Sequence, residues 1–432
     1  MSSFGSEPRN AIALDTPWKR AAVLGCVSVL SIFFLFVASR EFLASHYASK
    51  ADLASLQRAI RLSPGNAEYR LMLGRYLWAT GASPRAAANE YRAATSLNPH
   101  DADAWFELAG AAQVLEDVAT QGAALQQAVM MDPTTPELAW QAGSFFLVQG
   151  DSQKALQEFS VVVANEASLR MQALGLATHA ADIDTVIRQV MPPKADAYLD
   201  LLVLLMSKKD SAGAAKVWAA MTRLGQPVEQ RKALAYVNYL LLQREVEHAR
   251  AVWRQTLRLA GLSGYETSSN NLIVNPNFDS ELLNNGFDWH YNKMHSLSLA
   301  LDPTEFHAGH RSLSITFDGP GVNEAGVFQF VAVDPDTDYE FSAYYKSADM
   351  DGAGGPRFSL SDAYSGATYY LSDDLKNAEM WRDASGSFHT GPETRLLILR
   401  IIRIPAGSPI RGRLWVGDFR LAEKHPAREE GR

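Results

Sequence analysis

The chain contains three stretches that differ in the spacing of their apolar residues. An uninterrupted apolar run near the N-terminus is followed by a long segment with helical spacing, and then by a segment in which apolar and polar positions alternate. Helical spacing puts apolar side chains on one face every three to four residues, whereas alternation puts them on one face of a strand. The pattern therefore predicts an apolar helix, a helical domain and a β domain, in that order.

The apolar run comprises nineteen residues, 21–39, none of them charged. As a helix it would be about 28 Å long, close to the thickness of the hydrocarbon core of a bilayer. We expect a transmembrane helix at residues 21–39 and a cytoplasmic tail at residues 1–20.

Basic residues on either side of the run indicate its orientation. Arg9, Lys19 and Arg20 precede it, whereas Arg40 and Lys50 follow it. This bias favours a single-pass protein of the inner (cytoplasmic) membrane, with the bulk of the chain periplasmic or otherwise extracytoplasmic. A cleavable signal peptide is the alternative. However, the region before the apolar run is long, and the last residues of the apolar run form a poor cleavage site.

The second stretch, residues 51–261, is rich in Ala and Leu and has a period near 34 residues. Pro64, Pro99 and Pro133 are 35 and 34 residues apart, and each follows a segment with helical spacing. A period of this length indicates stacked helical pairs.

Within this period the residues resemble tetratricopeptide repeats. One copy contains Trp105-x2-Leu108-Ala109, and the next contains Ala142-Gly143 followed by Ala155-x3-Phe159. The resemblance implies an α-helical solenoid of five or six repeats, in which small residues let paired helices approach and aromatic residues fill the space between repeats. It also implies a protein partner on the concave face built by the first helices.

The third stretch, residues 270–423, follows a polar linker and precedes a polar tail at residues 424–432. Runs such as Leu313, Ile315 and Phe317 have apolar residues at every second position. Such alternation is typical of half-buried antiparallel strands, and nine or ten strand candidates predict a two-sheet β-sandwich.

Several segments of this sandwich resemble jelly-roll carbohydrate-binding modules of the galactose-binding-like superfamily. The similar segments are the opening strand at residues 271–279, Gly286-Phe287-Asp288-Trp289, and the closing strand at residues 414–421. The resemblance implies a domain that can contact glycan, although the superfamily includes many members that bind no sugar.

The β domain has more aromatic residues than one core needs, and sugar rings stack on aromatic side chains while nearby charged groups bind the hydroxyls. A polar, Tyr-rich segment at residues 361–370 is expected to be exposed. The candidate glycan-binding residues are Tyr364, Tyr369, Trp289, Trp381, Asp362 and Arg357. Each of the two tryptophans is more often a core residue than a binding residue.

The same resemblance suggests a structural calcium ion. Asp279 follows the first strand and Asp418 lies in the last, and acids at such places in the resembled modules often bind calcium. Calcium needs six to eight oxygen ligands, so two carboxylates are only part of a site. Simple hydrogen bonding in turns is the alternative, and no other cofactor is expected.

Composition and the absence of known motifs exclude several classes of function. A net charge of −8 argues against nucleic-acid binding, and the single cysteine, Cys26, excludes an intramolecular disulfide. The sequence contains no nucleotide-binding, α/β-hydrolase or zincin motif, and no pair of acids is placed as a glycosidase requires, so we expect no enzyme.

The leading hypothesis is a membrane-anchored envelope scaffold that docks a protein on its repeats and contacts glycan with its sandwich, in exopolysaccharide assembly or export. The alternative is an assembly factor in which both domains bind proteins. A glycoside-processing enzyme is a third, weaker reading.

Overall fold

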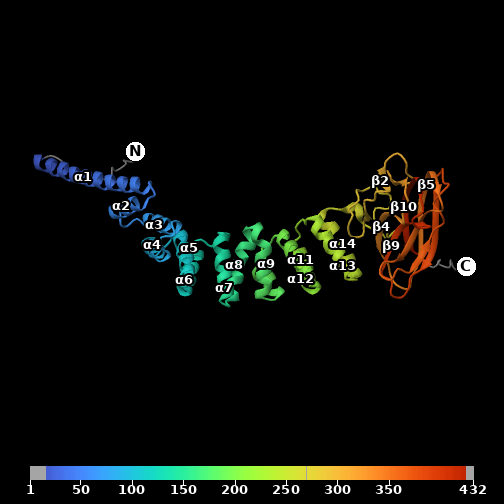
Figure 1. Cartoon of the computed structure of the whole chain (residues 1–432), viewed down its shortest axis with the longest axis horizontal. Helices are drawn as coiled ribbons and strands as arrows, with labels where there is room; N and C mark the ends of the chain where they lie inside the picture. Colours follow the sequence, from blue (N-terminus) through green and yellow to red (C-terminus); the bar gives the residue numbers. More distant parts are fainter. Residues whose placement is uncertain (1–15, 269, 425–432) are drawn as a thin grey trace, which may run out of the picture. The chain divides into compact units, whose positions relative to one another are not determined.

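The computed structural model describes residues 16–268 and 270–424. Residues 1–15 of the expected N-terminal tail and residues 425–432 of the expected polar tail lie outside the described residues. Helices form the N-terminal part and two antiparallel sheets form the C-terminal part (Figure 1), which confirms the expected fold class. The chain divides into two compact units, Met1–Ala181 and Asp182–Arg432, which are described in turn.

The described part of the first unit is helical. Most of its helices begin at a side-chain cap, as where the carboxylates of Asp52 and Asp101 each accept the backbone N–H three residues later. The helices are α1 (Pro17–Ala48), α2 (Leu53–Leu62), α3 (Ala67–Ala79), α4 (Pro84–Leu97), α5 (Ala102–Val114), α6 (Val118–Met131), α7 (Pro136–Val148), α8 (Ser152–Asn165) and α9 (Ala167–Ala180).

Glycines allow the helices of a pair to pack closely. A Cβ atom on Gly74 would lie 2.5 Å from Cε1 of Tyr91, and one on Gly143 would lie 2.9 Å from Cε1 of Phe159. Both aromatic rings are fully buried. These aromatic residues, which were expected to lie between repeats, therefore contact the small residues of the partner helix within their own pair.

Helix α1 is longer than the apolar run. The sequence indicated a helix ending near Ser39, but α1 continues to Ala48 because no glycine or proline interrupts it and the charges of Arg40 and Glu41 pair on its surface. Ala44 and Ala48, one turn apart, are buried against side chains of α2 and α3. The apolar run and the first helical pair thus share one continuous helix.

The second unit begins with five helices. They are α10 (Ile183–Gln189), α11 (Ala195–Ser207), α12 (Ser211–Thr222), α13 (Gln230–Leu242) and α14 (Val246–Ala260), followed by a short 3-10 turn, Ser263–Tyr265. Trp218 of α12 packs on Tyr236 of α13, with ring centroids 5.4 Å apart. Helices α11 and α12 form one helical pair, and α13 and α14 form the next.

The β domain is a sandwich of two five-stranded antiparallel sheets among the described residues. The first sheet has the order β1 (Trp289–Tyr291), β4 (Glu324–Ala332), β9 (Leu396–Ile404), β6 (Gly355–Asp362) and β7 (Thr368–Leu371). The second has the order β2 (Leu297–Asp302), β3 (Ser312–Gly319), β10 (Ile410–Glu423), β5 (Asp338–Gly352) and β8 (Arg382–His389).

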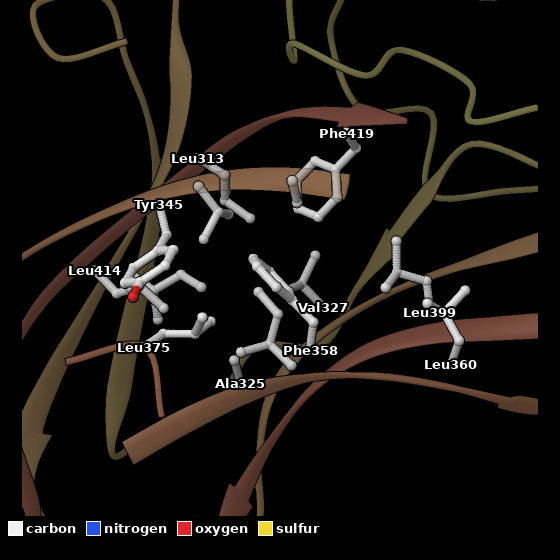
Figure 2. Close-up of a cluster of buried hydrophobic side chains, with 14 of the residues drawn as sticks. Leu313, Ala325, Val327, Tyr345, Phe358, Leu360, Leu375, Leu399, Leu414 and Phe419 are labelled. Atoms are coloured by element: carbon white, nitrogen blue, oxygen red, sulfur yellow. The ribbon is translucent and has the colours of Figure 1, made fainter. Parts of the chain in front are cut away.

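The core of the sandwich lies between the two sheets (Figure 2). Side chains such as Leu313 and Leu414 of the second sheet meet Val327, Phe358 and Leu399 of the first, and all are buried. Strand β9 lies at the centre of its sheet, as expected for a strand that is apolar on both faces.

Candidate functional site

Strand β4 exposes aromatic rings on the outer face of the first sheet. Val327 and Val331 point into the core, so alternation turns Phe328 and Phe330 to the opposite face, where both are half-buried. A strand that is apolar on both faces therefore keeps the aromatic rings of its outer face partly accessible.

His290 of β1 completes an aromatic cluster with these two rings. Its imidazole stacks on Phe328 with centroids 4.8 Å apart and planes at 11°, and it meets Phe330 edge-on at 5.4 Å. Nε2 of His290 lies 2.9 Å from the carbonyl oxygen of Gly286, which fixes Nε2 as the protonated nitrogen. Burial lowers the pKa of His290, so its ring is neutral near neutral pH. We call His290, Phe328 and Phe330 the aromatic cluster.

Polar side chains border the aromatic cluster on the next strands. Arg400 of β9 is exposed and lies opposite Phe328, and Ser359 of β6 lies opposite Arg400. Arg357, two residues along β6 on the same face, forms an ion pair of 2.6 Å with Asp374. The outer face therefore offers stacking rings next to hydrogen-bond donors and acceptors.

A cavity of about 470 Å³ adjoins the cluster where the sandwich meets the turn between α13 and α14. Its sandwich wall consists of His290, Phe330, Ala363, Tyr364 and Leu396, and its helical wall of Asn238, Leu241, Leu242 and Arg244. We call it the junction cavity. Both walls belong to the second unit.

A second cavity, of about 440 Å³, lies on the other side of Tyr364 and Arg244. It contains the side chains of Asp362 and Tyr369, and it is completed by Val246, Ser365 and the loop at residues 391–395. We call it the loop cavity. Tyr364 and Arg244 line both cavities and so form the wall between them.

The structure gives Tyr364 a role that the sequence did not suggest. Its hydroxyl donates to the backbone carbonyl of Leu241 in α13 at 2.7 Å, and the guanidinium of Arg244 lies over its ring at 5.1 Å. Burial raises the pKa of its phenol. Tyr364 is half-buried instead of exposed because the helical pair covers it.

Tyr369 and Asp362 are also held by neighbouring groups. The Tyr369 hydroxyl lies 2.6 Å from the hydroxyl of Thr394 and accepts the N–H of Gly391. Asp362 accepts the N–H groups of Tyr364 and Ser365. Burial would raise the pKa of Asp362, but hydrogen bonds with Ser365, Thr394 and Tyr364 outweigh it and lower the pKa.

The two predicted tryptophans lie apart from this site. Trp289 is only 1% exposed and its indole N–H donates to the carbonyl of Asn275, so it belongs to the core and offers no stacking face to a ligand. Trp381 lies next to His307, which stacks on Tyr344 of the second sheet. Of the six predicted residues, the structure brings Tyr364, Tyr369 and Asp362 together and places Arg357 on the adjoining sheet face.

The two predicted calcium ligands are engaged by histidines. Asp418 lies 3.0 Å from Nδ1 of His307, and Asp279 accepts the backbone N–H of His310. Within residues 16–268 and 270–424, no group of three or more His, Cys, Asp or Glu side chains is placed to hold a metal ion. Calcium therefore stays a prediction, and the partners of both carboxylates are distant in the sequence, not within one turn.

Sequence reasoning missed His290, Phe328 and Phe330. The signal that could have found the phenylalanines is the segment Gly326-Val-Phe-Gln-Phe-Val, in which both faces of one strand are apolar. The sequence does not tell which strands pair with this strand or which of its faces is buried in the core. Both are known only from the assembled sheets.

Family comparisons agree with this architecture. Residues 270–404 match a family described as a carbohydrate binding domain, and residues 53–88 and 82–136 match a family described as a tetratricopeptide repeat. Both are non-catalytic families. The chain thus combines tetratricopeptide-type repeats with a sandwich of the carbohydrate-binding type. No curated protein matches the chain.

Solved structures of the same two kinds are similar to parts of the chain. The repeat protein YrrB, described as having an unusual peptide-binding site, is 17% identical over 40% of this chain and 93% of its own, with a TM-score of 0.30. A structure described as "CBM4 structure and function" is 12% identical over 35% of this chain and 99% of its own, with a TM-score of 0.28. The CBM22-1 xylan-binding domain of Paenibacillus barcinonensis Xyn10C is 16% identical over 38% of this chain and 100% of its own, with a TM-score of 0.26.

Proposed function

We propose that this chain is a membrane-anchored, non-enzymatic scaffold whose sandwich binds a polysaccharide and whose helical repeats dock a protein. The observation that carries the proposal is the aromatic cluster on the outer face of the first sheet, in a segment that matches a carbohydrate binding domain. Export or assembly of an exopolysaccharide is the setting that this combination suits.

The chemistry of the outer face suits a sugar chain. The C–H faces of a sugar ring pack against aromatic rings, and each good stacking contact contributes about 1 kcal/mol beyond the area that it buries. A neutral imidazole stacks without the desolvation cost of a charge. The exposed guanidinium of Arg400 can then donate to sugar hydroxyls beside the cluster.

An anchoring role for α1 is supported by its composition. The best 18-residue window of the helix has a mean hydropathy of 2.6, and no part of that window is buried within the protein. Such a surface is stable in lipid and costly in water. We assign it as a single span of the inner membrane, with the N-terminus cytoplasmic and the repeats and sandwich outside.

Protein docking on the repeats is supported by apolar side chains that the described residues leave uncovered. Val114 ends α5 and is 57% exposed, and Val148 ends the equivalent helix α7 and is 83% exposed. First helices of this kind line the concave face of a repeat solenoid, where an extended partner segment can bind.

The test uses the full chain in lipid nanodiscs and a panel of soluble probes: xylan, barley β-glucan, β-1,4-galactan and polygalacturonate. Binding is measured by isothermal titration, and release of reducing ends is measured in parallel. We expect one of the probes to bind, no new reducing ends to form, and Phe328→Ala to weaken binding about tenfold.

The matched control is Phe306→Ala, which removes a phenylalanine that is 41% exposed and lies outside the aromatic cluster. It should leave affinity unchanged. Absence of binding to every probe would favour the assembly factor that binds only proteins. Equal affinities of wild type and Phe328→Ala would remove the aromatic cluster as the site.

A further inference from the structure

The last helical pair and the sandwich are joined by specific contacts within the second unit. Asn238 of α13 accepts the N–H of Gly286 at 2.8 Å and donates to the side chain of Asn285 at 2.8 Å. Trp253 of α14 packs edge-on against Phe287, with ring centroids 5.9 Å apart. These contacts hold the turn between α13 and α14 beside the first sheet.

Arg244 is the residue that this turn presents to both cavities. It has a left-handed backbone with φ of 64°, a conformation that arginine adopts rarely, two residues beyond the end of α13. Its guanidinium lies over the ring of Tyr364 and lines both the junction cavity and the loop cavity. Arg244 is exposed, and its contact with the face of the Tyr364 ring leaves its N–H groups available to a ligand.

Other charged groups near Arg244 do not neutralise it directly. Glu393 and Arg395 line the loop cavity as well, and both are exposed. The carboxylate of Asp362 is occupied by two backbone N–H groups. The junction cavity has no carboxylate among its lining residues, and its polar side chains are those of Arg244, Asn238, His290 and Tyr364.

We propose that Arg244 is a glycan-binding residue that the helical repeats contribute to the site on the sandwich, which makes the carbohydrate site composite. This inference rests on the proposed function of the outer sheet face. A guanidinium that is stacked on tyrosine is oriented in advance, and its fork of donors matches two adjacent oxygens on one sugar. The ligand chemistry is a paired oxygen acceptor, either two neighbouring hydroxyls or a carboxylate.

The experiment compares Arg244→Met, Arg244→Lys and Arg231→Ala in the full chain, again in nanodiscs. Methionine keeps the apolar packing over Tyr364 but removes the donors, and lysine keeps the charge but not the fork. Arg231 is an exposed arginine of α13, the helix that precedes Arg244, and it lines neither cavity, so its substitution is the control. Xylan supplies neighbouring hydroxyls, and polygalacturonate also supplies carboxylates.

We expect Arg244→Met to weaken binding about tenfold with an unchanged melting temperature, Arg244→Lys to weaken it two- to threefold, and Arg231→Ala to have no effect. If Arg244→Met binds xylan more weakly than wild type does, neighbouring hydroxyls are the acceptor. If it binds only polygalacturonate more weakly, the carboxylate is the acceptor. Wild-type affinity of Arg244→Met, together with weakened binding by Phe328→Ala, would overturn the composite site but leave the proposed function standing. No binding by wild type would overturn both.

Discussion

Gly286 lies directly against the indole of Trp253. A Cβ atom built on Gly286 would be 2.6 Å from Cζ3 of the indole, and the glycine has φ of 62°, in the left-handed region. Its N–H also donates to Asn238 of α13. Gly286 is thus the point at which the backbone of the sandwich contacts both helices of the last helical pair. No residue with a side chain satisfies both requirements without movement of the tryptophan.

Gly286→Ala should therefore destabilise the second unit by roughly 2–4 kcal/mol, because strain at positive φ adds to overpacking against Trp253. The control is Gly366→Ala, where φ is 76° but no atom lies within 4 Å of a new Cβ, so only the strain of about 1 kcal/mol applies. Calorimetric melting of both variants measures the difference. Equal losses would mean that the contact with Trp253 contributes nothing.

In the repeats, Gly143→Ala and Gly110→Ala should have effects of opposite sign. A Cβ on Gly143 meets Phe159 at 2.9 Å, whereas one on Gly110, within α5, meets no atom within 4 Å. We expect Gly143→Ala to cost about 1–3 kcal/mol through overpacking and Gly110→Ala to gain up to about 1 kcal/mol of helix propensity. Larger insertions, Gly143→Trp or Ala155→Trp, should cost more than Gly143→Ala. Urea unfolding followed by circular dichroism checks these values, and a stable Gly143→Trp variant would contradict the repeat packing.

The stability of the sandwich should depend on pH through Asp288. Burial raises the pKa of this carboxyl to about 7, and its Oδ2 accepts the N–H of Leu283. The folded state keeps a proton that the unfolded state has lost above about pH 4. The free energy of unfolding should therefore fall as pH rises from about 4 to about 7, by on the order of 4 kcal/mol.

The variant Asp288→Asn cannot titrate, so its unfolding free energy should vary less over this range than that of wild type. Asp351→Asn, which changes an exposed carboxyl, is the control. Denaturant titrations at pH 4.5, 5.5, 6.5 and 7.5 provide the comparison. Parallel pH profiles of wild type and Asp288→Asn would show that Asp288 is not the responsible group.

Membrane attachment should depend on the apolar character of α1. Leu30 and Phe33 are 65% and 64% exposed in the helix, and each arginine placed near the centre of a span costs about 2.5–3.5 kcal/mol. The double variant Leu30→Arg, Phe33→Arg should leave the carbonate-washed membrane fraction. Val148→Arg changes a residue that is 83% exposed in α7 and should stay with the membrane. Retention of the double variant would argue against a single-span anchor.

The repeats could be predicted because their signals are local. The spacing of Gly143, Ala155 and Phe159 follows from one helix pair packing on itself, and so does the 34-residue period of the prolines. The end of α1 could not be predicted in this way. Charges at Arg40 and Glu41 end the apolar run but not the helix, because an ion pair on a helix surface leaves the backbone hydrogen bonds intact.

The candidate site was only partly predictable, because it depends on surfaces that come from distant parts of the sequence. The tyrosine cluster pointed to Tyr364 and Tyr369, but nothing near Tyr364 in sequence indicates that Leu241 and Arg244 cover it. Tryptophan is a residue type that stacks on sugars, but Trp289 lies in the core because the pairing of its strand turns its side chain inward. Arg244, which lies in the helical part of the sequence, carries no local signal at all.

The continuity of α1 also sets the reach of the protein. A helix of 32 residues is about 48 Å long, and its last turns are part of the packed core of the first helical pair. When the apolar run occupies a bilayer, about 30 Å thick in its core, fewer than 20 Å of rigid helix remain on the two sides together. With the anchor proposed above, α1 would place no flexible linker between the bilayer and the first helical pair, and a partner bound to the first repeats would be kept at the membrane surface.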